Sequence, residues 1–225
     1  MAANIDTYVV VRVPLRRYEG YVGLMRQQVE VGEVRRKEDY MARIPIATRE
    51  SVPENQRAAF DQMAQRTGSV PQHGPGSVMI HVPEAGRLAG QLSNYLRNES
   101  SLPQKVQELA MLVTARELDC QHIWNSHAAS GRRAGLSDAL VDALRDKRDL
   151  PNPAPDEAAV VNYGREFFRT HHVSRGSFQA AQEQFGVQGL VELTILMGYY
   201  SLLAFNVNAF DTDLVPQRTE QILPV

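Results

Sequence analysis

Beyond residue 40, capping and terminating residues divide the sequence into helices, and this pattern constrains the fold more than any other feature. Ser51-Val52-Pro53-Glu54 has the spacing of a capping box with proline in the first turn, and it predicts a helix that runs to about Arg66. Gly135-Leu136-Ser137 is typical of one helix ending and another being capped, and Gly186 has the position of a helix terminator. No regular strand pattern follows residue 40. The sequence therefore predicts an all-α fold.

The remaining boundaries come from the same signals. Composition predicts a loop over residues 71–76, and either Ser100 or Ser101 is expected to cap a helix that begins near Leu102. A proline-rich surface connection is expected over residues 149–155. Further helices are predicted over about 83–96, 156–169, 174–184 and 187–208.

The first 40 residues differ from the rest. Residues 7–13 are β-branched and strand-like, but no later strand is available to pair with them, and residues 18–34 predict a weak helix. A self-sufficient domain is expected to start at Met41. We therefore expect an N-terminal extension over residues 1–40, one domain over 41–216 and a C-terminal tail over 217–225.

Composition excludes several classes of protein. The chain has 225 residues, of which 43% are apolar and 22% charged, so it can bury one sizeable core or two small ones. Its formal net charge of −2, without long runs of one sign, argues against binding to nucleic acid or to an anionic membrane surface. Polar residues interrupt the apolar stretch 190–210, which predicts a buried helix and not a membrane span. A single cysteine and no apolar leader predict a cytoplasmic location.

Residues 108–127 bring several reactive side chains together in one short segment. This short apolar segment contains the only cysteine, Cys120, the only tryptophan, Trp124, the carboxylate Glu108 and the imidazoles of His122 and His127. On a straight helix Glu108 would lie about 18 Å from Cys120, too far for the two to share a proton. The segment must therefore bend if its side chains are to act together.

Asp119 offers a place for the bend. As an N-cap it would end one helix and start another with Cys120 in its first turn, where the helix dipole lowers a thiol pKa. His127 lies seven residues further, on the same helix face as Cys120. If the preceding helix folds back, Glu108 could orient an imidazole and complete a relay of carboxylate, imidazole and thiol.

Structural roles remain open for the same side chains. A lone cysteine on an apolar helix is most often a core residue, and His122 and His127 could be satisfied imidazoles. The spacing of Cys120, His122 and His127 matches no standard zinc pattern, so neither a metal nor a cofactor is expected. Trp124 is expected on the core side, where it could pack or line a substrate pocket with Ile123.

The segment resembles the carboxymuconolactone decarboxylase and alkylhydroperoxidase D superfamily. Its disulfide-reductase branch has the pattern Glu, eleven residues, Cys, any residue, His, Cys, three residues, His, and this chain supplies Glu108, Cys120, His122 and His127 at those spacings. Ile123 replaces the second cysteine, where a branch of uncharacterised bacterial members usually has an acid. The resemblance extends over about residues 41–216, and it implies an all-α protein that assembles as a homo-oligomer.

The missing thiol decides which chemistry the resemblance implies. With Ile123 no internal disulfide can form, so a sulfenic acid on Cys120 would need an external thiol reductant. Our leading hypothesis is a single-thiol peroxidase with Cys120 as nucleophile, His127 as base, Glu108 as its orienter and His122 in the relay. A lyase or hydrolase that acts on a small carboxylated or lactone substrate through His127 and Glu108 is the alternative, and a non-catalytic oligomeric binding protein is the third.

Overall fold

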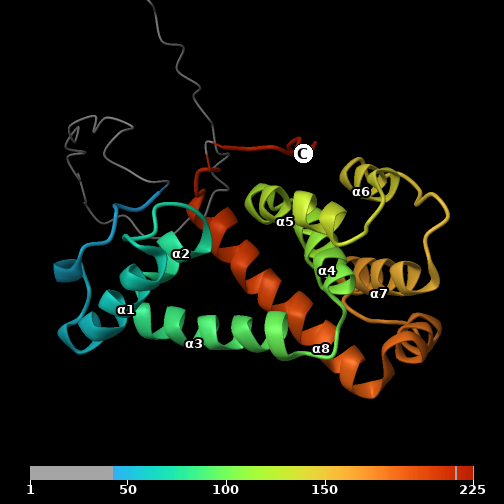
Figure 1. The fold of residues 1–225 in the computed structure, drawn as a ribbon, viewed down its shortest axis with the longest axis horizontal. Coiled ribbons are helices and arrows are strands. Elements are labelled where there is room, and N and C mark those ends of the chain that lie inside the picture. The colour runs from blue at the N-terminus through green and yellow to red at the C-terminus, as the bar shows by residue number, and fades with distance from the viewer. Residues whose placement is uncertain (1–42, 216, 225) are drawn as a thin grey trace, which may run out of the picture. The chain divides into compact units, whose positions relative to one another are not determined.

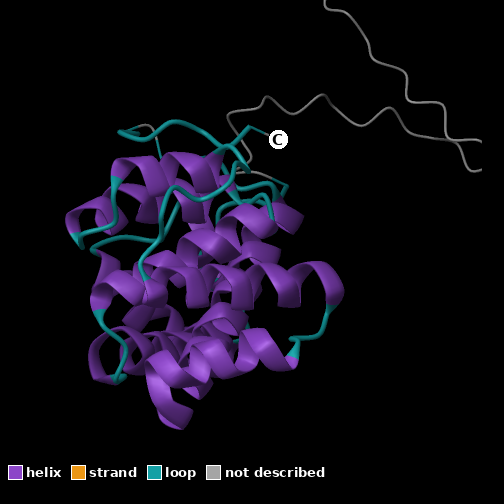
Figure 2. Cartoon of the chain, turned by 90° about the vertical axis from the view of Figure 1, so that its right-hand side faces the viewer, coloured by secondary structure: helices purple, strands orange, loops and turns teal. Residues whose placement is uncertain are grey.

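The computed structural model describes residues 43–215 and 217–224 (Figure 1). Within these ranges the regular structure is helical and no β-strand is present (Figure 2), which confirms the all-α prediction. The expected extension over residues 1–40, with its strand at 7–13 and helix at 18–34, lies outside the described residues.

Eight α-helices form the described part of the chain, together with short 3₁₀ and π turns. Two 3₁₀ turns, η2 (Arg49–Ser51) and η3 (Glu54–Gln56), precede the first helix, and one π turn, η4 (Tyr95–Glu99), continues the third. The α-helices are α1 (Arg57–Thr67), α2 (Gly74–Met79), α3 (Pro83–Asn94), α4 (Gln104–Glu117), α5 (Gln121–Arg133), α6 (Asp138–Arg145), α7 (Pro155–Thr170) and α8 (Arg175–Phe210).

Helix α4 is the centre of the core. Every residue from Val106 to Arg116 is buried, which is the pattern of a helix surrounded by other helices. Helices α5, α7 and α8 pack directly against it, and α8 crosses the middle of the view in Figure 1. A second, smaller apolar cluster lies around α1 and α2 and is made of Ala47, Val52, Phe60, Met63 and Ile80.

Several predicted boundaries are confirmed. Gly186 has a φ of 66° and non-helical geometry inside α8, so it separates the two helical segments expected there. Ser137 caps α6 by accepting a hydrogen bond from the amide of Leu140, and Gly135 before it has a φ of 103°. Helix α3 begins at Pro83 as expected.

Three predictions near helix starts are wrong. The capping box is formed by Thr48 and Ser51 around η2, so the main helix begins only at Arg57. The stretch expected as a loop over 71–76 already contains the first residues of α2, which starts at Gly74. Neither Ser100 nor Ser101 caps α4, because the serine at 101 is engaged with a buried carboxylate of α8.

One helix in the described ranges, α8, is long and apolar enough to cross a membrane by length and composition alone. Of its most apolar window, 56% is buried inside the protein, and the helix packs against α4 and α7. This burial supports the prediction of a core helix for residues 190–210.

Glu192 is the buried carboxylate that fixes the start of α4 to α8. It accepts hydrogen bonds from the Tyr95 hydroxyl at 2.8 Å, from the Ser101 amide at 2.8 Å and hydroxyl at 2.6 Å, and from Gln188 at 3.1 Å. Burial alone would raise the pKa of Glu192, but these hydrogen bonds outweigh it and lower the pKa to about 2.

We expect Glu192→Gln to lower the free energy of unfolding by about 2 kcal/mol at neutral pH, because an amide cannot accept all four hydrogen bonds. Because the folded pKa of about 2 lies below the ordinary value of 4.5, this stabilisation is present above about pH 4.5 and is lost toward pH 2. Urea unfolding at several pH values measures it, with the exposed Glu183→Gln on the same helix as control. Equal losses in the two variants would contradict the role of Glu192.

Candidate functional site

The chain reverses direction between α4 and α5. Asp119 lies in the left-handed region with a φ of 48°, and the amide of Cys120 donates to the carbonyl of Ala115 at 2.7 Å. The break is therefore where the sequence predicted it, but Cys120 itself, and not Asp119, is the N-cap residue of α5. Because of the reversal, α5 packs back along α4.

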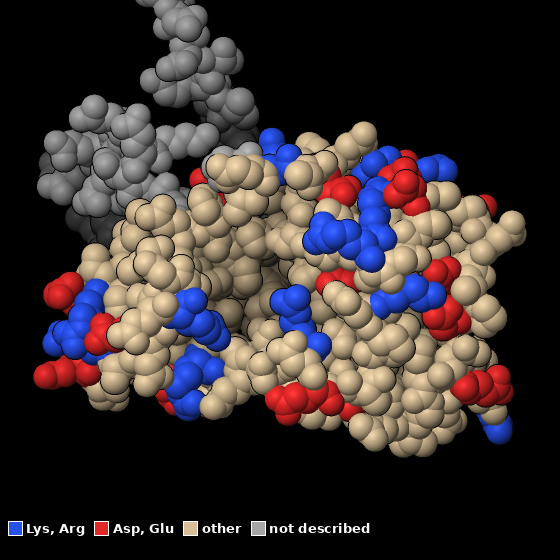
Figure 3. All heavy atoms as spheres, viewed as in Figure 1, with Lys and Arg blue, Asp and Glu red and all other residues tan. Residues whose placement is uncertain are grey.

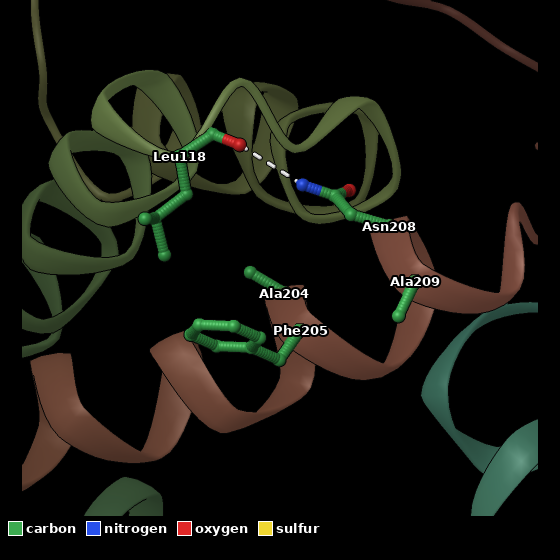
Figure 4. A pocket seen from close by; sticks show the side chains of 5 residues that line it. All are labelled: Leu118, Ala204, Phe205, Asn208 and Ala209. Carbon is green, nitrogen blue, oxygen red and sulfur yellow. Dashed lines mark hydrogen bonds between the residues drawn. The ribbon is translucent and has the colours of Figure 1, made fainter. Parts of the chain in front are cut away.

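Helix α8 holds this reversal from the other side. The Asn208 side chain donates to the carbonyl of Leu118 at 2.9 Å (Figure 4). An apolar cavity of about 330 Å³ lies beside this hydrogen bond. Its lining residues are Leu118, Ala204, Phe205, Asn208 and Ala209.

The reversal brings Glu108 and His127 together. His127 Nδ1 lies 2.8 Å from Glu108 Oε2, although the residues are 19 apart in sequence, and both side chains are nearly buried. When the carboxylate accepts the proton on Nδ1, the free lone pair is on Nε2, the tautomer of a general base. The carboxylate and imidazole of the predicted relay are thus in contact.

Tyr200 of α8 completes the surroundings of the imidazole. Its ring meets that of His127 edge to face, with centroids 5.1 Å apart and an interplanar angle of 81°. Burial raises the pKa of Tyr200 above its ordinary value, so the phenol is protonated at neutral pH. The sequence alone indicated no role for Tyr200, because only the fold brings it to His127.

The thiol lies in a different environment from the one expected. Cys120 has an exposed fraction of 0%, and burial raises its pKa, although backbone amides of Ile123 and His122 act in the opposite direction. The prediction of a thiol pKa lowered by the helix dipole is therefore wrong. His127 is seven residues away on α5, or about 10 Å along the helix axis, so it is not placed to take the thiol proton directly.

His122 is partly buried beneath the start of α2. A side chain at Gly74 would place its Cβ only 2.2 Å from His122 Nε2, so the glycine, with a φ of 65°, lets α2 lie against the imidazole. Nδ1 of His122 is buried without a hydrogen-bond partner among the described residues. Burial, and then the nearby His127 and His73, lower the pKa of His122 to about 4.

The two residues assigned to substrate binding are core residues. Ile123 is 2% exposed and Trp124 is 1% exposed, and both belong to the main buried cluster. Neither lines the cavities described in this section, so their assignment to a substrate pocket is not supported by this packing.

A polar cleft reaches the other side of Glu108. One cavity of about 410 Å³ includes Glu108, and it shares Arg97 and Asn98 with a second cavity of about 500 Å³ that includes Arg66. Figure 3 shows one face of the molecule, which is hollowed near its middle and has side chains of Lys or Arg beside the hollow. Arg97 and Asn98 lie in the π turn η4, a type of irregularity that is frequent at functional sites. Sequence reasoning missed both arginines, since only the fold brings Arg97 into the cavity of Glu108 and Arg66 into the adjoining one.

Comparison with known proteins supports the predicted resemblance. Residues 83–166 match the sequence model of the family described as Carboxymuconolactone decarboxylase family. This match covers the segment that carries the motif. It contains Glu108, Cys120, His122 and His127, so the predicted relationship is confirmed for the part of the chain that carries the motif. No curated protein sequence matches the chain.

Solved structures share the fold of this carboxymuconolactone decarboxylase-like chain. An uncharacterized peroxidase-related protein from Ralstonia eutropha, described as an alkylhydroperoxidase AhpD core, has 16% identity and a TM-score of 0.62 over 79% of this chain and 94% of its own. A peroxidase-related protein from a Silicibacter species has 16% identity and a TM-score of 0.59 over 82% and 96%. The debrominase Bmp8 has 14% identity and a TM-score of 0.56 over 72% and 87%. At these identities the likeness shows the fold alone.

The partly buried His122 gives a testable pH dependence. Its folded pKa of about 4 is below the ordinary value of 6.5, so protonation disfavours the folded state and stability falls as pH drops from about 6.5 toward 4. The free energy of unfolding should therefore fall less with pH in His122→Gln than in the wild type, by about 2 kcal/mol. Urea unfolding between about pH 7 and pH 4.5 measures it, with the exposed His172→Gln as control. An unchanged pH dependence in His122→Gln would show that the imidazole is not held neutral by its burial.

Proposed function

We propose that the chain is an enzyme of acid–base chemistry in which His127 and Glu108 act on a small anionic substrate, as a lyase of the carboxymuconolactone decarboxylase type. The observation that carries this proposal is the 2.8 Å contact between His127 Nδ1 and Glu108 Oε2, in which the carboxylate also borders a polar cavity. The cleft is large enough for a small organic acid.

The contact suits proton transfer at Nε2 of His127. In a decarboxylation the bond between the substrate carbon and its carboxylate breaks, carbon dioxide leaves, and the electron pair stays on carbon. An imidazolium at His127, whose positive charge Glu108 offsets, donates its Nε2 proton to that carbon, and the neutral imidazole then takes a new proton from water. Such a positioned acid–base group contributes about 10²- to 10⁴-fold to the rate.

The cleft supplies positive charge for the substrate. Arg97 lies between the two cavities, and Arg66 faces the larger one, where its guanidinium rests against α3 at Gly90. Guanidinium groups bind carboxylates through paired hydrogen bonds, so a substrate with one or more carboxylates fits this lining.

A single-thiol peroxidase remains the second candidate, because the fold is shared with proteins described as peroxidase-related. In that reaction the Cys120 thiolate attacks a peroxide, gives a sulfenic acid and an alkoxide, and is restored by two equivalents of an external thiol. The buried thiol with its raised pKa offers little thiolate for this step. The residue one turn before His127 is Ile123 and not a thiol. Both observations favour the acid–base reaction.

Variants of the three side chains separate the two reactions. We expect His127→Ala and Glu108→Gln to lower kcat/KM on lactone acids by about 100-fold or more, because the first removes the proton donor and the second removes the carboxylate that positions it. Cys120→Ala should stay within about threefold, since the buried thiol takes no part. Two assays are needed: the turnover of lactone acids is followed by NMR, and the consumption of peroxide is measured in the presence of an added dithiol. The exposed His172→Ala is the control in both.

The opposite pattern favours the other candidates. If Cys120→Ala abolishes peroxide consumption and lactone acids are not turned over, the peroxidase is the better description. If no form of the protein turns over either class of substrate while organic acids still bind, the site is that of a binding protein.

An exposed apolar stripe on α8 supports assembly into a homo-oligomer. Val187, Val191, Ile195, Leu202 and Phe205 are between 41% and 71% exposed and share one face of the helix. A continuous apolar surface of this kind is typical of an interface. We therefore propose that a second copy of the chain covers it.

We expect Phe205→Asp, which places a charge on the most exposed residue of this stripe, to shift the protein to a smaller species in light scattering. Gln184→Asp, which adds the same charge at an exposed polar position of α8, should leave the mass unchanged. A wild-type protein that is monomeric at micromolar concentration would contradict the interface.

A further inference from the structure

Residues 217–224, which we call the strap, run along α5 as an extended segment, from Arg132 near its end to Gln121 at its start, drawn in red above α5 in Figure 1. The Gln121 side chain holds both backbone groups of Leu223. Its Nε2 donates to the Leu223 carbonyl at 2.8 Å, and the Leu223 amide donates to its Oε1 at 2.8 Å. This amide pairs with the strap as the backbone of a neighbouring strand would.

Two further contacts hold the strap in place. Arg116, whose side chain is 1% exposed, donates from Nη1 to the carbonyl of Pro224 at 3.3 Å. Glu220 lies 3.5 Å from the guanidinium of Arg132 on α5. The strap therefore has an ionic contact at its first part and a buried hydrogen-bonded contact at its end.

The strap also closes the core. Leu223 is 1% exposed and belongs to the same buried cluster as Cys120, whereas the adjacent Ile222 is 54% exposed. The sequence predicted a tail outside the domain for these residues, yet Leu223 packs as a core residue does.

The residues that hold the strap are sequence neighbours of Cys120. Gln121 directly follows Cys120, and Arg116 also pairs with Asp119, which directly precedes it. The thiol between them is completely buried. A short segment that is held at its edge by a few side chains opens at a lower free energy than the helices behind it.

We propose that the strap is a gate for Cys120: while it is closed it excludes solvent and reagents from the thiol, and its local release exposes the thiol without unfolding the helices. This gate does not depend on the reaction at Glu108 and His127. It makes the reactivity of Cys120 a property of the strap and not of the helix start.

Because Cys120 is the only cysteine, its labelling by an aromatic disulfide reports on the gate alone. The thiolate displaces a coloured aromatic thiolate and forms a mixed disulfide, so absorbance gives the rate of exposure. At about pH 8, near the ordinary thiol pKa, we expect Leu223→Asp to raise the labelling rate by at least about tenfold. Ile222→Asp carries the same charge on the neighbouring exposed residue and should stay within about twofold.

A second variant keeps the test decisive if Leu223→Asp fails to fold. Gln121→Glu retains the size of the side chain but loses the donor to the Leu223 carbonyl, and it should raise the labelling rate by at least about threefold. Circular dichroism verifies that each labelled variant is folded. In low urea the wild-type rate should change little, because local release exposes little surface.

Three results would overturn the gate. Rates that stay unchanged in folded Leu223→Asp and Gln121→Glu show that another element covers the thiol. An equal increase in Ile222→Asp assigns the effect to the added charge. A wild-type rate that rises with urea as steeply as global unfolding shows that the thiol is exposed only when the whole domain opens.

Discussion

The reversal between α4 and α5 is the constraint on which the candidate site depends. A single non-glycine residue in the left-handed region, Asp119 with a φ of 48°, turns the chain so that Glu108 and His127 meet at 2.8 Å. Aspartate tolerates this conformation better than most residues. Its pairing with the buried Arg116 and the 2.9 Å hydrogen bond from Asn208 to Leu118 stabilise the turn from two sides.

The burial of α4 gives the Glu108 carboxylate two roles at once. A carboxylate in this core is costly unless it is hydrogen-bonded, and His127 supplies the partner. The same hydrogen bond fixes the tautomer and orientation of the imidazole, with Tyr200 packed edge-on against its ring. The pairing of a buried carboxylate and the orientation of the imidazole thus rest on one contact.

The sequence predicted those features of the fold that depend only on neighbouring residues in the chain. The break at Asp119, the cap at Ser137 and the terminator Gly186 depend on residues within one helical turn. Contacts across the fold left no such signal. Ser101 pairs with Glu192, 91 residues away, instead of capping α4, and Gln121 pairs with Leu223, 102 residues away. The arginines of the cleft escaped prediction for the same reason.

The thiol shows why a helix start alone does not determine chemistry. The dipole at the start of α5 favours a thiolate by a modest amount, but complete burial of Cys120 disfavours the charge more, and the net pKa is raised. Position 123 also disfavours thiol chemistry. The isoleucine there is 2% exposed, and it gives His127, one turn later on α5, an apolar neighbour. A fold shared with peroxidase-related proteins therefore presents, in this chain, an imidazole paired with a carboxylate beside a polar cleft. Proton transfer needs only that pair, whereas thiol chemistry needs the strap to open first.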